Sequence, residues 1–336
     1  YGLFQASMAW RMPRKKSPAT AATLSRGSFS INWIILLPIT TASATLALIA
    51  AGVQRVVVAM LDPNPLVAGS GVKILQDAGI VVETGLLQAE AIALNPGFLY
   101  KMQYQRPFVR LKLAASVDGA IALANGQSKW LTGDAAREDV QLLRAQSCAI
   151  LSTAETVLCD NALLNVRAAD ITSLENGSIR QPLRIILDRQ CRLTGQEPLF
   201  LQGGDIILLH QAQARENDSW PLLQLPESTL LTVQRHALAL AADGLFDLKA
   251  VIAFIATLPV NVLWVEAGAK LASSLWQQQL VDELVLYQAP MLLGHNATPM
   301  LQLPTYSHMS ETPRWQWQDV CKIGDDLRLI ARLKGH

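Results

Sequence analysis

The chain has 336 residues, with 28 Lys and Arg, 27 Asp and Glu, and a formal net charge of +1. This length allows two domains with a sizeable core, and the near-zero charge provides no basic field that would attract nucleic acid. The four cysteines are scattered and include no CxxC pair. That pattern is typical of a protein from a reducing cytosol and argues against a disulfide framework.

Charge divides the chain into two unlike pieces. Residues 1–61 carry six basic residues and no Asp, Glu, His or Cys, whereas from Asp62 onward acids and bases intermix. Residues 1–45 show no clear helical or strand period, so we expect a degenerate or disordered segment there. An out-of-frame stretch of a former domain and a newly acquired tail both fit this composition.

The uncharged run 27–54 is long enough to span a bilayer, and the basic residues before it would suit a signal anchor or a transit peptide. Pro38, the polar stretch 40–45 and Gly52 argue against such a span. Residues 46–60 are instead typical of a helix, a glycine stop and a buried parallel strand. We therefore expect no membrane partner.

A compact α/β unit is predicted over residues 46–98. Its first strand, 55–60, ends at a turn with two prolines. A helix is predicted over 72–78 and a second strand over 80–83. Residues 104–107 are predicted to be the linker to a larger domain that occupies 104–336.

The larger domain alternates predicted strands and helices. Strands are predicted over 109–115, 149–153, 183–188, 205–209, 230–233, 261–266, 283–289 and 327–333, and helices over 135–145, 248–258 and 270–280. This alternation predicts a mostly parallel sheet that is covered on both faces. Open sheets of this kind bind ligands at the carboxyl ends of their strands.

Polar residues fall at several of these strand ends. A buried strand ends at Glu266-Ala267-Gly268, and a helix follows. The N-terminus of that helix could bind a phosphate. A glycine between a strand and a helix, however, usually only forms a turn. Lys112 alternates with apolar neighbours, so its side chain could face either the site or the solvent. Taken alone, Arg144 would be a solvated helix arginine and Trp130 a core residue.

The motifs Ser116-Val117-Asp118-Gly119, Asn125–Gly133, Asp62-Pro63-Asn64-Pro65 and Asn95-Pro96-Gly97 together resemble the bacterial riboflavin-biosynthesis deaminase–reductase family. The resemblance implies a dihydrofolate-reductase-like α/β domain over 104–336, preceded by a remnant of a cytidine-deaminase-like α/β domain over 46–98. It also implies a cytoplasmic homo-oligomer that uses NADPH to reduce a small-molecule substrate, 5-amino-6-(5-phosphoribosylamino)uracil, by hydride transfer to ribose C1.

The deaminase chemistry of that family requires a zinc ion on one His and two Cys, or on three Cys, with a Glu to carry protons. Residues 1–61, where the resemblance places these groups, contain none of the three residue types. We therefore expect no zinc and no deaminase activity.

The resemblance also implies the roles of individual residues. Those expected to bind the substrate are Ser128, Arg144, Leu164, Arg167 and Glu266. Those expected to bind the cofactor are Ala114, Trp130, Thr156, Asp160, Gly268, Ala269, Lys270, Leu271, Ala272, Ser273 and Ser274. Lys112 and Asp160 are the candidates for supplying a proton during reduction.

Four residues depart from the family's motifs. Ala120 replaces a basic residue, and Asn161 and Ala162 replace an acid and a proline. Arg189 replaces a serine at the expected cofactor edge, where it could contact an NADPH phosphate or block it. Two alternatives therefore stay open: an inactive or partner-dependent degenerate member, and a related reductase of another pterin or uracil compound.

Overall fold

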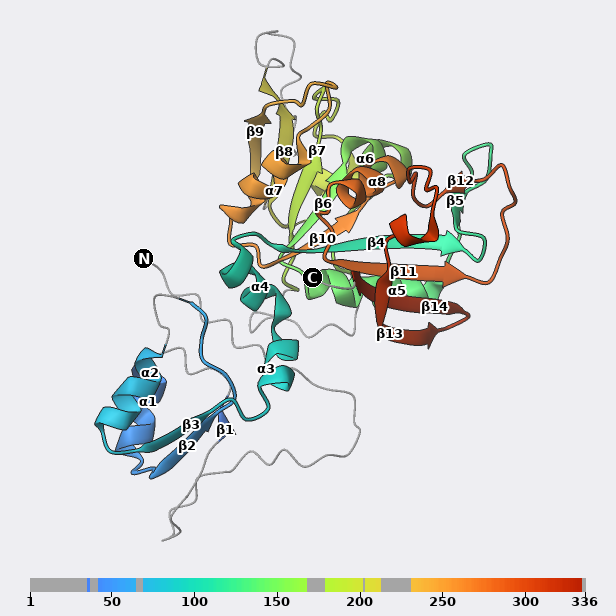
Figure 1. Ribbon diagram of the computed structural model, residues 1–336. Helices are drawn as coiled ribbons and strands as arrows, with labels where there is room; N and C mark the ends of the chain where they lie inside the picture. Colours follow the sequence, from blue (N-terminus) through green and yellow to red (C-terminus); the bar gives the residue numbers. More distant parts are fainter. Residues whose placement is uncertain are drawn as a thin grey trace.

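The computed structural model describes residues 35–36, 42–64, 69–167, 179–201, 203–212 and 231–333. They form a small three-stranded sheet and a nine-stranded sheet, joined by two short helices (Figure 1). In these residues no helix is long and apolar enough to cross a membrane. Most of the segment 1–45, for which we predicted degeneracy or disorder, lies outside the described residues.

The small sheet is parallel throughout and contains the strand predicted from residues 46–60. Its elements are β1 (Ile35–Leu36), α1 (Ala42–Ala50), β2 (Arg55–Val58), α2 (Ser70–Asp77) and β3 (Val81–Thr84). Gly52, at φ 69°, follows α1 as the predicted stop. Val56 and Val58 of β2 pack with Leu75 of α2 in a core of their own.

The connection between the two sheets is mostly helical, and the predicted linker, 104–107, covers only the end of its second helix and the part after it. Helices α3 (Gln88–Leu94) and α4 (Pro96–Tyr104) form most of the connection, and Pro96 suits the first turn of α4 because its missing N–H would have no helical partner there. Leu99 of α4 packs against Ala59 and Met60 beside the small sheet. The Lys101 ammonium donates to the Leu258 carbonyl at 2.6 Å on the other side. Helix α4 is therefore a bridge held at both ends.

The large sheet has the order β13-β14-β11-β4-β10-β6-β7-β8-β9. Its strands are β4 (Phe108–Ser116), β6 (Ala149–Thr153), β7 (Leu183–Leu187), β8 (Ile206–Gln211), β9 (Val233–Leu238), β10 (Val262–Glu266), β11 (Glu283–Ala289), β13 (Trp315–Ile323) and β14 (Asp326–Leu333). The strands from β11 to β9 pair in parallel, and β14 and β13 are antiparallel. Beside it, β5 (Ala120–Ala122) pairs with β12 (Thr298–Pro299).

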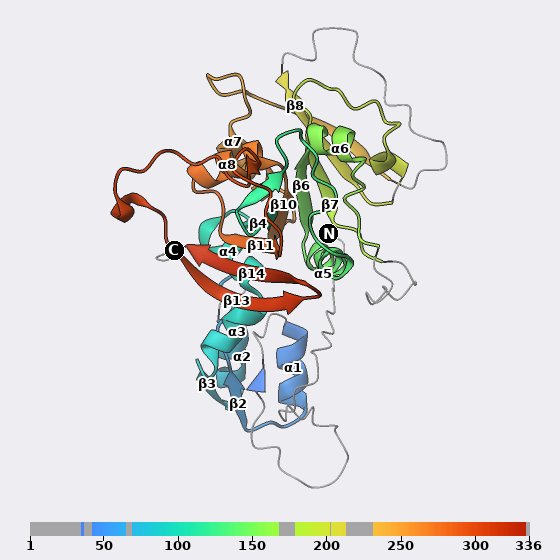
Figure 2. The same cartoon turned by 90° about the vertical axis from the view of Figure 1, so that its right-hand side faces the viewer.

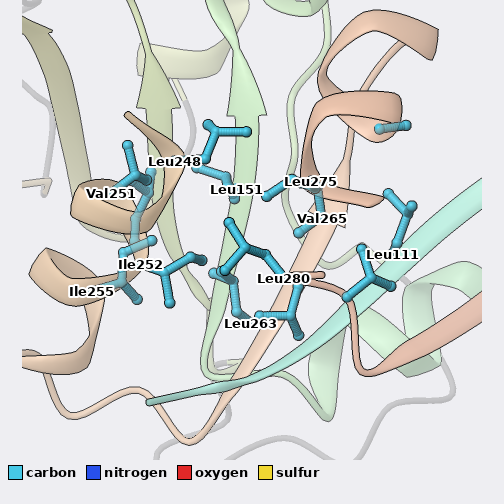
Figure 3. Close-up of a cluster of buried hydrophobic side chains, with 14 of the residues drawn as sticks. Leu111, Leu151, Leu248, Val251, Ile252, Ile255, Leu263, Val265, Leu275 and Leu280 are labelled. Atoms are coloured by element: carbon cyan, nitrogen blue, oxygen red, sulfur yellow. The ribbon is translucent and has the colours of Figure 1, made fainter. Parts of the chain in front are cut away.

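Helices cover both faces of this sheet, as the alternation predicted (Figure 2). They are α5 (Asp134–Ala145), α6 (Ala154–Asp160), α7 (Leu248–Ala256) and α8 (Ala269–Gln277). Helices α7 and α8 cover an apolar cluster that includes Leu111, Leu151 and Leu263 (Figure 3). Helices α5 and α6 cover the opposite face. Because side chains alternate along a strand, Lys112 and Ala114 of β4 fall on the α5 face.

Most predicted elements are confirmed, and several were missed. The strands predicted over 149–153 and 283–289 agree with β6 and β11 to the residue. The strand predicted over 230–233 is displaced, since β9 begins at Val233 and residue 230 lies outside the described residues. The helices and strands that the sequence did not predict are β1, β5, β12, β13, α3, α4 and α6.

Asp282, just before β11, is the point where α4 is fastened to the large sheet. Its carboxylate accepts hydrogen bonds from the Tyr100 hydroxyl at 2.5 Å and from both terminal nitrogens of Arg106 at 2.9 and 2.7 Å. It also accepts from the Val109 backbone N–H at 2.7 Å. One carboxylate thus joins α4, the segment after it and the beginning of β4.

We expect Tyr100→Phe to lower the free energy of unfolding by roughly 1.5–3 kcal/mol, because it removes a hydrogen bond to a charged acceptor. Tyr104→Phe is the matched control, since Tyr104 is 50% exposed and its ring packs against that of Tyr100 in a tilted arrangement, at a centroid distance of 4.4 Å. It should change stability by less than about 0.5 kcal/mol. Urea unfolding of both full-length variants measures the difference, and equal losses would mean that the hydrogen bond from Tyr100 to Asp282 adds no stability of its own.

Candidate active site

The polar residues of the α5 face gather near the carboxyl ends of β4 and β10. Lys112 and Glu266 are register partners on these adjacent parallel strands, so their side chains leave the sheet side by side. Glu266 ends β10, and the chain then enters α8 through Gly268. This arrangement places a lysine and a carboxylate beside a helix N-terminus.

Arg144 of α5 is not a solvated helix arginine. It is 8% exposed, and its Nε and Nη2 donate to the two Glu266 carboxylate oxygens at 2.5 and 2.8 Å. Its Nη1 donates to the Asn165 carbonyl at 2.9 Å. The Trp264 indole N–H adds a fourth contact, to Glu266 Oε1 at 2.8 Å. The interpretation of Arg144 as a solvated helix arginine is wrong, because its guanidinium forms a buried bidentate ion pair with Glu266.

Electrostatics keep this cluster charged. Burial alone would raise the pKa of Glu266, but the Arg144 guanidinium and the Lys112 ammonium outweigh it and lower the pKa to about 2. Burial lowers the pKa of Lys112, and the neighbouring Glu266 carboxylate opposes that shift. The Lys112 ammonium therefore loses its proton more readily than that of a solvated lysine.

The Lys112 ammonium donates no hydrogen bond to any described residue. It lies 6.0 Å from the centroid of the Tyr287 ring, and the Tyr287 hydroxyl donates to Asp139 of α5 at 2.6 Å. Arg328 of β14 binds the same carboxylate with both distances 2.9 Å. Tyr287 is thus fixed in place beside an ammonium whose donors are available to a ligand.

The other predicted substrate residues flank this cluster. Leu164 is 2% exposed with φ 50°, so it packs in the core and sets the path of the chain toward Arg167. Arg167 is exposed, and its Nη1 donates to Asn165 Oδ1 at 2.9 Å. Burial and then the Arg144 charge lower the pKa of Arg167. Ser128 is exposed and lies in the segment before α5.

The N-terminus of α8 has room for a ligand. Gly268 is extended, a Cβ placed on it would meet no atom within 4 Å, and no side chain caps the helix. Gly268 and Lys270 are exposed, whereas Ala269 is buried. The first-turn N–H groups therefore offer a site for an anion.

The remainder of the predicted segment is turned toward the protein. Ala272 is fully buried, Leu271 packs against the main core, and the Ser273 hydroxyl donates to the Ala269 carbonyl and accepts from the Gln302 N–H. The Ser274 hydroxyl donates to the Lys270 carbonyl at 3.0 Å. Only the first turn of α8 is thus open to a cofactor without rearrangement.

Trp130 is 71% exposed and therefore is not core packing. The Arg137 guanidinium stacks over its ring at 4.6 Å. Its neighbour Lys129 reaches across to Asp160 at the end of α6, with Nζ 3.5 Å from Oδ1. Two of the predicted cofactor residues, Trp130 and Asp160, are brought together by this contact between segments.

The remaining cofactor candidates lie on the strand ends. Thr156 lies in the first turn of α6, and its N–H donates to the hydroxyl of Thr153, the N-cap residue, at 3.2 Å. Ala114 is the register partner of Tyr287 and lies on the α5 face. Within the described parts of the chain, no group of three His, Cys, Asp or Glu side chains could hold a metal ion.

The residues that depart from the family's motifs have structural partners. Asn161 caps α6 in the left-handed conformation, which asparagine tolerates well. Arg189 Nη1 donates to the Gly244 carbonyl at 2.5 Å. Near Ala120, the matching motif residue Asp118 accepts hydrogen bonds from the Ser116 hydroxyl and from the Leu293 and Gly294 N–H groups, and these bonds lower its pKa.

Three residues of the site were not predicted. Trp264, Asp139 and Tyr287 hold Glu266, α5 and Lys112 in place through the contacts above. The only sequence signal for them is spacing, because Trp264 lies two residues before Glu266 on the same face of a strand. Nothing in the sequence links Asp139 to Tyr287, 148 residues later.

Residues 107–329 match the family described as the RibD C-terminal domain. The riboflavin biosynthesis protein RibD of Haemophilus influenzae is 41% identical over 304 residues, which is 88% of this chain and 77% of that protein. A 5-amino-6-(5-phosphoribosylamino)uracil reductase of Buchnera aphidicola subsp. Acyrthosiphon pisum is 32% identical over 217 residues, or 63% of this chain and 99% of that protein. The first match is too long to be confined to the larger domain and extends into the smaller α/β unit.

Solved structures support the same grouping. Acinetobacter baumannii RibD (form 1) is 35% identical, with 90% of this chain and 80% of that chain covered and a TM-score of 0.76. A Thermotoga maritima diaminohydroxyphosphoribosylaminopyrimidine deaminase/5-amino-6-(5-phosphoribosylamino)uracil reductase is 27% identical, with 86% and 74% covered and a TM-score of 0.69. The predicted fold class, a dihydrofolate-reductase-like α/β domain behind a deaminase-like remnant, is confirmed. The residue boundaries of the two domains stay predictions.

The low pKa of Glu266 predicts an acid-sensitive contribution to stability. A carboxyl group whose pKa is about 2 in the folded protein contributes stability that is complete above its unfolded pKa and is lost as the pH falls toward 2. We therefore expect wild-type protein to lose more stability than Glu266→Gln between pH 6 and pH 3. Urea unfolding at the two pH values measures this, and parallel losses in the two proteins would contradict the assignment.

Proposed function

We propose, because the chain belongs to the RibD C-terminal domain family, that it reduces 5-amino-6-(5-phosphoribosylamino)uracil to the ribitylamino product with NADPH. The observation that carries the proposal is the juxtaposition of Lys112 and Glu266 with the uncapped N-terminus of α8. A reductase of this kind needs a proton donor beside an anion site for its dinucleotide. The reductase relative from Buchnera, matched over 99% of its length, supports the assignment.

The residues present suit a dinucleotide. The first-turn N–H groups of α8 and the open space at Gly268 would hold its diphosphate, with Lys270 at the same turn. Trp130, Thr156 and Asp160 would contact the rest of the cofactor, and Ala114 leaves room beside the sheet. The nicotinamide, when bound, supplies hydride.

Arginines would hold the ribose 5-phosphate of the substrate. Arg144 already donates three hydrogen bonds to protein acceptors, whereas Arg167 donates one from its guanidinium and is exposed. We assign the direct phosphate contact to Arg167. Arg144 adds positive charge beside it, Ser128 adds a hydroxyl, and the buried Leu164 sets the path of the chain toward Arg167. Glu266 Oε2 keeps a lone pair for a substrate hydroxyl.

Lys112 would supply the proton. In the ring-opened imine, hydride adds to ribose C1, the C=N π electrons move to nitrogen, and that nitrogen takes a proton from the Lys112 ammonium. Burial lowers the pKa of Lys112, which makes the proton easier to give, and Glu266 keeps the ammonium charged in the resting site. The neutral amine then regains a proton from water. Asp160, tied to Lys129, is assigned to the cofactor and not to this step.

We expect Lys112→Met to lower kcat by about a hundred- to ten-thousand-fold, the usual contribution of a general acid. In the wild type, activity should fall with rising pH as Lys112 loses its proton, at a pH below that of an ordinary lysine. The residual activity of Lys112→Met should not show this decrease at high pH. The matched control is Lys101→Met. Burial also lowers the pKa of Lys101, but this lysine is on α4 and donates to the Leu258 carbonyl. A kcat unchanged in Lys112→Met would remove the lysine from the mechanism.

We expect Arg167→Met to raise KM for the substrate about ten- to a hundred-fold, because it removes a charge-assisted hydrogen bond. The change in kcat should be small, since the phosphate is remote from the reacting carbon and is bound alike in ground and transition states. Steady-state kinetics with saturating NADPH measure both constants. The control is Arg180→Met, whose guanidinium donates to the Ala145 and Ser147 carbonyls behind α5. A loss in kcat alone would place Arg167 elsewhere in the reaction.

A further inference from the structure

Arg189 stands at the carboxyl end of β7 and is held by a turn from another part of the chain. Its Nη1 donates to the Gly244 carbonyl at 2.5 Å. Gly244 lies in a tight turn before α7, with φ 75°, and its own N–H donates to the Ala241 carbonyl at 2.9 Å. The contact fixes the direction of the side chain and leaves the other guanidinium donors available.

Arg189 has no carboxylate partner among the described residues. The neighbouring Asp188 carboxylate accepts instead from the Arg192 and Leu193 N–H groups, each at 2.9 Å. The next arginine, Arg192, is neutralised by Glu155 at 2.8 Å. Of these two arginines after β7, therefore, only Arg189 has a positive charge without a carboxylate partner in the described part of the chain.

The sheet order determines which part of a dinucleotide would reach Arg189. Strands β4 and β10 carry Lys112 and Glu266, and α8 follows β10. The order continues β10-β6-β7, so Arg189 lies two strand spacings, about 10 Å, beyond β10 on the side away from Lys112. With its diphosphate at α8 and its nicotinamide directed toward Lys112, a dinucleotide would extend its adenosine toward β7.

We propose that Arg189 binds the 2′-phosphate of the adenosine ribose and makes the protein prefer NADPH to NADH. The inference rests on the proposed function, since it requires a dinucleotide seated at α8. A guanidinium suits a phosphate monoester because it donates two parallel hydrogen bonds. The hydrogen bond to the Gly244 carbonyl orients the Arg189 guanidinium, so that its other N–H groups can donate to a phosphate at the strand end.

Binding measurements on the full-length protein test the proposal without turnover. Isothermal titration calorimetry would compare NADPH with NADH, and adenosine 2′,5′-bisphosphate with 5′-AMP, in the wild type, Arg189→Ser, Arg189→Lys and Arg192→Ser. We expect Arg189→Ser to weaken NADPH and the bisphosphate at least about tenfold, and NADH and 5′-AMP less than about twofold. The NADPH affinity of Arg189→Lys should lie between those of the wild type and Arg189→Ser, because lysine keeps the charge but cannot donate two parallel hydrogen bonds. Arg192→Ser should match the wild type.

The outcomes separate this inference from the proposed function. Wild-type protein that binds NADPH and NADH equally well would overturn the role of Arg189 and leave the reductase assignment standing. Equal weakening of both dinucleotides in Arg189→Ser would also overturn it, by showing a contact to the diphosphate or a loss of fold that circular dichroism would detect. If neither dinucleotide binds the wild type, both the inference and the proposed function fail.

Discussion

The buried ion pair between Arg144 and Glu266 is the interaction on which the rest of the site depends. It joins α5 to the end of β10 across 122 residues of sequence. Removing one partner of such a pair typically costs about 3–5 kcal/mol, because the other charge is left buried without compensation. The same guanidinium holds the Asn165 carbonyl. Glu266 and the backbone that leads to Arg167 are therefore positioned by one side chain.

A second network keeps α5 in the place that this ion pair requires. Asp139 of α5 accepts from Tyr287 of β11 and from Arg328 of β14, and Arg328 also binds Asp319 of β13 at 2.8 Å. The antiparallel hairpin β13–β14 is thus attached to the helix that supplies Arg144. Tyr287 in turn bounds the Lys112 ammonium. The C-terminal strands, which carry none of the predicted site residues, hold the site together through α5.

The sequence predicted the parts of the fold that periodicity determines. Buried strands such as β6 and β11 contain a short apolar run between turn signals, so their bounds were found. Strand β13 was missed because its side chains are mostly exposed, and the hairpin turn at Gly324 was its only clear signal. Helix α6 follows β6 without a loop, and only the cap by Thr153 marks its start. Lys112 could be placed on a strand, but the choice between site and solvent depended on Glu266 and Tyr287, which are distant in sequence.

The charges of the cluster account for the kind of substrate that it suits. Lys112, Arg144 and Arg167 carry three positive charges, and the Glu266 carboxylate, kept ionised by its low pKa, balances one of them. A phosphate monoester carries about −1.5 to −2 charges near neutral pH, so it would complete the balance that the protein leaves open. A neutral ligand would leave like charges close together in a partly buried space, which costs free energy. The site is therefore unfavourable when empty and is relieved by an anion, and this preference comes from side chains on β4, α5 and β10 that only the folded sheet brings together.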